Sequence, residues 1–242
     1  MIQLPSNSLI IVTGAANGNG FAISKKLENS GAEIVRVDKS ELPQNPNNFS
    51  GDVTNEDFIA EVYDFCSTKK FKFIGLVNNA GITLPSEFPY PKSFWDKTVE
   101  VNLTAPFLWI ETFMPLFIKS ANGSIVNITS LGAERAFPNN PSYIASKGGL
   151  KMLSKYYAKS LGKNGIRVNN LGPGYIETDM TKSSFSNKKT KINRENHTFL
   201  HRWGKPDDVA DACCFLFSEE SKYITGQDIY VDGGWLSNGL IE

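Results

Sequence analysis

The sequence has no excess charge of either sign and few cysteines. Its 25 basic and 25 acidic residues cancel, whereas proteins whose main partner is nucleic acid or a membrane surface carry a basic excess. Three cysteines, of which Cys213 and Cys214 are adjacent, give neither an even-numbered disulfide framework nor the spacing of a zinc site. We therefore expect a cytoplasmic protein in reducing surroundings that holds no metal and binds no nucleic acid.

Long apolar runs are missing as well. The longest near the start, residues 9–12, is too short for a membrane span or the core of a signal peptide, and it leads directly into a glycine-rich segment. No shift in composition marks a linker, and the sequence contains no internal repeat. Because a chain of 242 residues suits one α/β domain with a well-buried core, we expect a single domain over residues 1–242 and no contact with a membrane.

Short apolar segments alternate with longer segments of helical spacing. Strands are predicted at residues 9–13, 33–38, 74–78, 124–130, 167–171 and 228–231, and helices at 21–29, 55–69, 92–118 (interrupted by Pro106 and Pro115), 141–161 and 206–217. Two prolines exclude a helix from residues 40–50. Residues 181–199 are poor in apolar periodicity and are expected to be mobile. They belong to a longer segment, at about 175–203, that we expect to cover the substrate as a flap. The alternation predicts an α/β fold: a single-domain, Rossmann-like, doubly wound parallel sheet with helices on both faces.

Three glycines, Gly14, Gly18 and Gly20, lie between the first predicted strand and the first helix. Glycine tolerates positive φ and allows a phosphate to approach the N–H groups at the positive end of a helix. Asp38 ends the second strand about 20 residues further on, where an acid can hold the ribose of an adenosine. This arrangement predicts a dinucleotide site, and the alternative is a tight turn that binds nothing.

The spacing Thr-Gly-x3-Gly-x-Gly, from Thr13 to Gly20, resembles the classical short-chain dehydrogenase/reductase family. Further motifs extend the resemblance over essentially the whole chain: Asp52-Val53, Asn78-Asn79-Ala80-Gly81, Pro173-Gly174 with Thr178, and Asp232-Gly233-Gly234. Two positions depart from the family pattern, since Asn19 replaces an aliphatic residue and Gly172 precedes the proline. The resemblance implies cofactor contacts from Gly14, Asn17, Gly18, Asn19, Gly20, Asp38, Asp52, Val53, Asn79, Ala80, Gly81, Tyr143, Lys147, Pro173, Gly174, Ile176 and Thr178.

Tyr143 and Lys147 are four residues apart on one predicted helix and so share a face, and Ser130 ends a predicted strand. In the family, a Ser–Tyr–Lys set interconverts carbonyls and alcohols. A phenol is a poor base at neutral pH, and a nearby ammonium together with the positive nicotinamide ring of an oxidised cofactor stabilises the phenolate. Ser130 can donate a hydrogen bond to the substrate oxygen. The alternative is a buried tyrosine and a surface lysine on an ordinary helix.

Asn102 matches the asparagine with which the family holds a water molecule in a proton relay behind the lysine. Because Pro106 has no N–H, the carbonyl of residue 102 loses its helical partner and is free to accept from such a water. The alternative is a simple proline kink beside an incidental asparagine.

These observations predict an NAD(P)-dependent oxidoreductase that interconverts a secondary alcohol and a ketone, with Tyr143 as acid and base, on a small polar substrate such as a sugar or polyol derivative. The alternatives are a 3-oxoacyl-carrier-protein reductase and a non-catalytic, dinucleotide-binding redox sensor. We expect NAD in preference to NADP, because Asp38 would repel a 2′-phosphate and the glycine loop offers only the neutral Asn17. NADP remains an alternative, because Lys39 or Arg36 could reach its 2′-phosphate. Arg36 shares a strand face with Asp38, however, and one interpretation is that it pairs with Asp38 instead.

The predicted helix 141–161 is apolar over more of its circumference than one sheet face can cover. Family members bury this helix between subunits, so we expect a homo-oligomer, and specifically a homotetramer. The flap at 181–202 is rich in cations and has the single acid Glu195. It is interpreted either as a solvated basic loop or as a field that attracts an anionic substrate.

Overall fold

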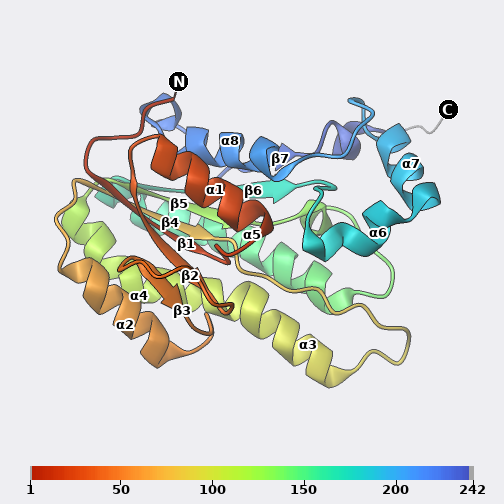
Figure 1. Ribbon diagram of the computed structural model, residues 1–242, viewed down its shortest axis with the longest axis horizontal. Helices are drawn as coiled ribbons and strands as arrows, with labels where there is room; N and C mark the ends of the chain where they lie inside the picture. Colours follow the sequence, from red (N-terminus) through yellow and green to blue (C-terminus); the bar gives the residue numbers. More distant parts are fainter. Residues whose placement is uncertain (1, 240–242) are drawn as a thin grey trace.

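The computed structural model describes residues 2–239, which form a single α/β domain around one parallel sheet (Figure 1). The strand order is β3-β2-β1-β4-β5-β6-β7, and every neighbouring pair is parallel. The strands are β1 (Ser8–Thr13), β2 (Glu33–Asp38), β3 (Asn48–Ser50), β4 (Phe73–Asn78), β5 (Gly123–Ile128), β6 (Ile166–Pro173) and β7 (Asp228–Val231). The order reverses beside β1, so the predicted doubly wound sheet is confirmed.

Helices cover both faces of the sheet because alternate strand residues point to opposite sides. Leu9 and Ile11 of β1 enter one apolar core together with α2 (Glu56–Ser67), α4 (Ala105–Ser120) and α5 (Pro141–Leu161). Ile10 and Val12 enter a second core, which α1 (Gly18–Asn29) and α8 (Pro206–Phe217) close from the other side (Figure 1). The two layers hold the strand ends, and hence the loops that follow them, in fixed positions.

The predicted helix over residues 92–118 is three consecutive elements: α3 (Lys92–Val99), a π-helical turn (Glu100–Thr104) and α4. In the turn, the N–H of Ala105 donates to the carbonyl of Glu100. Pro106, which cannot donate, therefore follows a widened turn, whereas Pro115 lies inside α4 without ending it.

Lys92–Ser120 is also the one stretch within residues 2–239 that is long and apolar enough, by length and composition, to cross a membrane. Its large side chains Trp109, Phe113 and Phe117 are fully or almost fully buried against the sheet. The apolar character of this stretch is therefore that of a helix in the core of a domain.

Two irregular segments differ from the prediction. Residues 40–50 contain no helix, as expected, but they end in the short strand β3, which extends the sheet beyond β2. Residues 181–199, expected to be a mobile flap, contain two helices that the sequence did not predict, α6 (Lys182–Ser186) and α7 (Lys188–His197). Neither helix buries a residue, so neither needs the apolar periodicity by which a helix is recognised in a sequence.

Candidate active site

A cleft of about 710 Å³ lies where the strands end, on the edge at which parallel α/β sheets place their ligands. Most of the predicted site residues line it: Gly14, Asn17, Gly18, Asn19, Asp38, Asp52, Val53, Asn79, Ala80, Gly81, Ser130, Tyr143, Lys147, Pro173, Gly174, Ile176 and Thr178. Gly20 and Asn102 do not, because both are buried beneath its surface. The cleft thus joins the glycine loop at one end to Tyr143 at the other.

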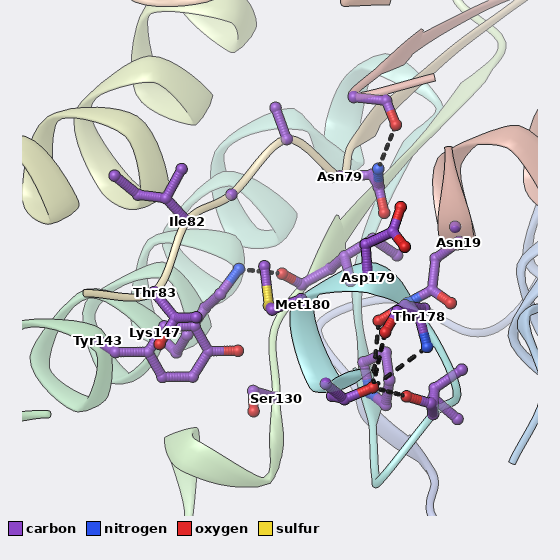
Figure 2. Close-up of a pocket in the computed structure, with 18 of the residues that line it drawn as sticks. Asn19, Asn79, Ile82, Thr83, Ser130, Tyr143, Lys147, Thr178, Asp179 and Met180 are labelled. Carbon is purple, nitrogen blue, oxygen red and sulfur yellow. Dashed lines mark hydrogen bonds between the residues drawn. The ribbon is translucent and has the colours of Figure 1, made fainter. Parts of the chain in front are cut away.

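The glycine loop is pressed against the segment that follows β4. Thr13 Oγ1 accepts hydrogen bonds from the N–H groups of Asn79 and Ala80, both at 3.1 Å. Asn79 Nδ2 donates in return to the carbonyls of Thr13 and Gly14, both at 3.0 Å (Figure 2 shows Asn79 at this position). A Cβ at Gly14, whose φ is +66°, would lie 2.9 Å from Ala80 Cα, and a Cβ at Gly20 would lie 1.9 Å from the carbonyl oxygen of Gly14. Both positions therefore require glycine.

The start of α1 lines the cleft opposite Thr178. α1 begins at Gly18, whose φ is +54° and whose Cβ, if present, would be 3.3 Å from Thr178 Cγ2. The side-chain oxygen of Asn19 is buried and has no hydrogen-bond partner among residues 2–239. A narrow backbone cradle with free N–H groups and an unpartnered amide suits a phosphate-bearing ligand with its own hydrogen-bond donors.

Asp38 is held by two backbone groups. Its Oδ2 accepts from the N–H of Ala16 at 2.9 Å and its Oδ1 from the N–H of Ser40 at 2.8 Å. The interpretation that Arg36 pairs with Asp38 is wrong, because Arg36 pairs with Glu28 on α1 at 2.8 Å. Asp38 therefore faces the cleft as a carboxylate without a cationic partner within residues 2–239.

Lys39 also has another partner. It forms an ion pair with Asp52 at 2.9 Å across the mouth of the cleft. The hydrogen bond from Lys39, together with the backbone and hydroxyl of Thr54, lowers the pKa of Asp52 to about 2. Asp52 is consequently ionised at neutral pH, and the ammonium of Lys39 is drawn toward it.

Tyr143, Lys147 and Ser130 converge at the other end (Figure 2). Tyr143 and Lys147 lie one turn apart on α5, and Ser130 follows β5 at the start of a short 3-10 turn, where its Oγ accepts from the N–H of Gly132 at 3.0 Å. Lys147 Nζ donates to the carbonyl of Ile128 at 2.7 Å and lies 5.9 Å from the centroid of the Tyr143 ring. The three side chains thus come from two elements, β5 with its loop and α5, that pack against each other.

Burial controls the charges at this end. Burial raises the pKa of Tyr143, and the hydrogen bond with the Ser130 hydroxyl lowers it by a smaller amount. Burial also lowers the pKa of Lys147 to about 8. The Lys147 ammonium is directed at the carbonyl of Ile128, and its stabilisation of a Tyr143 phenolate beside an oxidised nicotinamide stays a prediction. The protein groups alone therefore keep Tyr143 as a neutral phenol and Lys147 as an ammonium at neutral pH.

Asn102 occupies the π-helical turn and is fully buried. Its Oδ1 accepts from the N–H of Ile82 at 2.8 Å, and its Nδ2 donates to the carbonyl of Ile82 at 2.9 Å and to Ser146 Oγ at 3.3 Å. The side chain thus joins the loop after β4 to α5. In the structure, Asn102 connects two segments behind the cleft. The role of Asn102 in a proton relay remains a prediction.

Several polar residues of the cleft were not predicted from the sequence, among them Thr83 and Asn140. Thr83 follows β4, and Asn140 directly precedes α5, three residues before Tyr143. Spacing to Tyr143 was the only available signal, and asparagine is common before any helix. Phe137 lines the cleft as well, whereas Glu134 turns away to contact Lys151 and Tyr230.

Comparison with known proteins agrees with this geometry. The family model described as enoyl-(acyl carrier protein) reductase matches residues 14–236. The chain belongs to the classical short-chain dehydrogenase/reductase family. It is therefore an NAD(P)-dependent oxidoreductase acting on alcohol and ketone groups, as the sequence predicted.

Relatives with different substrates resemble the chain over nearly its whole length. A 3-oxoacyl-[acyl-carrier-protein] reductase of Thermotoga maritima is 37% identical over 93% of this chain and 96% of its own. A gluconate 5-dehydrogenase of Burkholderia cenocepacia, in a structure with NADP and tartrate, is 28% identical with a TM-score of 0.89, and covers 97% of both chains. A 4-hydroxyisoleucine dehydrogenase complexed with NADH is 29% identical with a TM-score of 0.87, over 96% of this chain and 99% of that one. Structures of relatives thus contain either NADP or NADH.

Proposed function

We propose that the chain interconverts a secondary alcohol and a ketone in this cleft, with Tyr143 transferring the proton. The observation that carries the proposal is the joining of a glycine-loop cradle to a buried Tyr143–Lys147–Ser130 cluster in one continuous cavity. The nicotinamide, when bound, supplies or accepts the hydride. Gly14, Gly18 and Asn19 would hold the pyrophosphate of the dinucleotide. Asp38, Asp52 and Val53 would hold its adenosine, and Ile176 and Thr178 would hold its nicotinamide.

The side chains divide the remaining work. Tyr143, a neutral phenol at neutral pH, donates its proton to the carbonyl oxygen during reduction and takes one from the alcohol during oxidation. Lys147 stabilises the phenolate that this donation leaves behind, provided that its ammonium leaves Ile128. Ser130 donates to the same substrate oxygen and so limits where it can lie. Asn102 fixes the loop that carries Gly81 and Ile82.

The substrate we propose is a small polar molecule such as a sugar or polyol derivative. Support comes from Thr83 and Asn140, which add hydroxyl and amide groups to the Tyr143 half of the cleft (Figure 2). A second candidate, a 3-oxoacyl-carrier-protein reductase, is favoured by the 37% identity to the Thermotoga maritima enzyme. Sugars, polyols and 3-oxoacyl thioesters, each with both cofactors and followed by the absorbance of the reduced nicotinamide, separate the two. Higher kcat/KM for the thioesters would select the second candidate.

We propose NAD as the preferred cofactor, since the unpaired carboxylate of Asp38 can accept from both ribose hydroxyls and would repel a 2′-phosphate. The ion pairs of Arg36 with Glu28 and of Lys39 with Asp52 support this choice, because each cation has a carboxylate partner that a 2′-phosphate would have to displace. Relatives occur in complexes with NADP and with NADH, so we assign the choice in this chain to these few side chains.

We propose further that the chain is a cytoplasmic homotetramer. Met152 and Tyr156 on α5 are each 62% exposed, and Phe107 and Ile118 on α4 are exposed as well. Exposed apolar side chains on two helices that cover the same face of the sheet favour burial against another copy of the chain. Sedimentation at micromolar concentration tests this state, and a monomer there would contradict it.

A further inference from the structure

Two polar side chains meet at the Tyr143 end of the cleft. Asn140 Nδ2 donates to Thr83 Oγ1 at 2.7 Å, and both residues line the cleft with Ser130 and Tyr143. Figure 2 shows Thr83, on the loop after β4, at the same end of the cleft as Tyr143. The reaction described above uses neither residue.

The backbone around Asn140 is held in place from both sides. The carbonyl of Asn140 accepts from the N–H of Ile144 in the first turn of α5, and the carbonyl of Asn139 accepts from the N–H of Ser86 at 2.9 Å. The hydroxyls of Tyr90 and Ser142 are 2.7 Å apart and join the same two segments. Asn140 is therefore presented to the cleft in a fixed orientation.

The pair has unused hydrogen-bonding capacity. Asn140 is only 9% exposed, and its Oδ1 receives no hydrogen bond from any group within residues 2–239. A reversed amide would leave Nδ2 without a partner in its place. Thr83 Oγ1 accepts from Asn140 but donates to no group in the part of the chain that the structure describes. A buried acceptor without a donor is unfavourable, so a ligand that supplies the donor is bound selectively.

We propose that Thr83 and Asn140 bind a hydroxyl on the carbon next to the reacting carbonyl, so that the substrates are α-hydroxy ketones and the corresponding vicinal diols. A hydroxyl accepts one hydrogen bond and donates another; here it accepts from Thr83 and donates to Asn140. Asn140 directly precedes α5 and lies three positions before Tyr143, and it lines the same cleft as Tyr143 and Thr83. We therefore place the neighbouring hydroxyl at this pair in a substrate whose carbonyl oxygen meets Tyr143.

The proposal rests on the proposed function and narrows its substrate class. In a 3-oxoacyl thioester, the carbon between the ketone and the thioester is a methylene group and carries no hydroxyl. Such a substrate has no hydroxyl there to donate to Asn140. A site built to hydrogen-bond a hydroxyl discriminates against the analogue that lacks it, because its own polar groups are then left unpaired.

The test compares 3-hydroxy-2-butanone with 2-butanone, two ketones with the same carbon skeleton that differ by one hydroxyl. We expect the wild type to favour the hydroxy ketone by at least about tenfold in kcat/KM. Thr83→Val keeps the side-chain shape and removes the hydroxyl, and it should bring the ratio close to one, mainly by raising KM for the hydroxy ketone. Thr83→Ser restores the hydroxyl and should restore the preference. Asn140→Leu is the second variant and should also abolish the preference.

Cofactor Kd and thermal melting of each variant show whether it remains folded and able to bind the dinucleotide. A wild type that treats the two ketones alike, or a folded Thr83→Val that keeps the full preference, would overturn the inference. Acetoacetyl-CoA serves as a third substrate: higher kcat/KM for it than for the hydroxy ketone would also overturn the inference while leaving the reaction type intact. If the wild type turned over none of these substrates and no sugar or polyol, that result would contradict the proposed function itself.

Discussion

The two ends of the cleft are built differently. At the glycine-loop end, Thr13 and Asn79 satisfy each other and the neighbouring backbone, and Gly14 and Gly20 occupy positions that admit no side chain. At the Tyr143 end, side chains from separate segments provide the surface, and Asn140 has an acceptor without a partner. The first end is thus suited to a ligand shared by a family, and the second to a ligand particular to this chain.

Tyr143→Phe is expected to separate the two ends most strongly. The variant keeps the ring and loses the proton donor, so turnover should fall by about 10²–10⁴-fold while cofactor Kd changes by less than about threefold. Kinetics and equilibrium cofactor titration measure the two quantities. Tyr223→Phe, at a fully exposed tyrosine, is the matched control and should behave like the wild type. Substantial turnover by Tyr143→Phe would show that another group moves the proton.

Asp38→Ala alters the glycine-loop end alone. Removing the carboxylate should raise kcat/KM for NADPH relative to NADH by about 10–100-fold, because a like charge no longer faces the 2′-phosphate. The preference between 3-hydroxy-2-butanone and 2-butanone should not change. Glu61→Ala, an exposed acid on α2, controls for net charge. A wild type that prefers NADPH would refute the cofactor assignment, as would an Asp38→Ala variant with no relative gain for NADPH.

The pH dependence of the reduction rate tests whether Lys147 must be charged. Reduction requires the ammonium of Lys147 and the phenol of Tyr143 together. Because burial lowers the pKa of Lys147 to about 8, the rate of reduction should be level below that pH and should fall as pH rises through it, approaching about tenfold per unit. kcat/KM profiles in the reductive direction measure this limb. A rate that stays level to pH 10 would mean that the charge on Lys147 is not needed.

The smallest effect is expected at the basic flap. Lys182, Lys188 and Lys189 lie on α6 and α7, outside the cleft lining. If the substrate is anionic, changing all three to Gln should raise its KM by about two- to fivefold, more at low ionic strength, and leave a neutral substrate unaffected. The matched control changes Lys119, Lys163 and Lys222, far from these helices in sequence. An unchanged KM for the anionic substrate would show the flap to be a solvated basic segment.

The glycine-loop end could be predicted from the sequence because backbone geometry leaves a trace there. Gly14 and Gly20 occupy positions that no larger residue fits, and Asp38 ends a strand with clear β-branched character. Tyr143 and Lys147 could be paired for a similar reason, since helical spacing fixes their common face.

The rest depended on contacts between distant segments. The partners of Arg36 and Lys39 are fixed by how α1 and the loop after β3 pack, which strand alternation does not reveal. Residues 182–197 form helices on the rim of the domain without an apolar stripe, so periodicity missed them. Thr83 and Asn140 are 57 positions apart and meet only because β4 ends and α5 begins at this edge.

The central claim is that a nicotinamide and a ketone exchange a hydride directly in this one cleft, with Tyr143 supplying the proton. The most direct measurement uses reduced cofactor deuterated at the transferring position of the nicotinamide, 3-hydroxy-2-butanone as substrate, and mass spectrometry with NMR of the diol formed. We predict one deuterium on the newly formed carbinol carbon in the wild type, and greatly reduced product in Tyr143→Phe. Deuterium lost to solvent, or product without deuterium, would contradict the account.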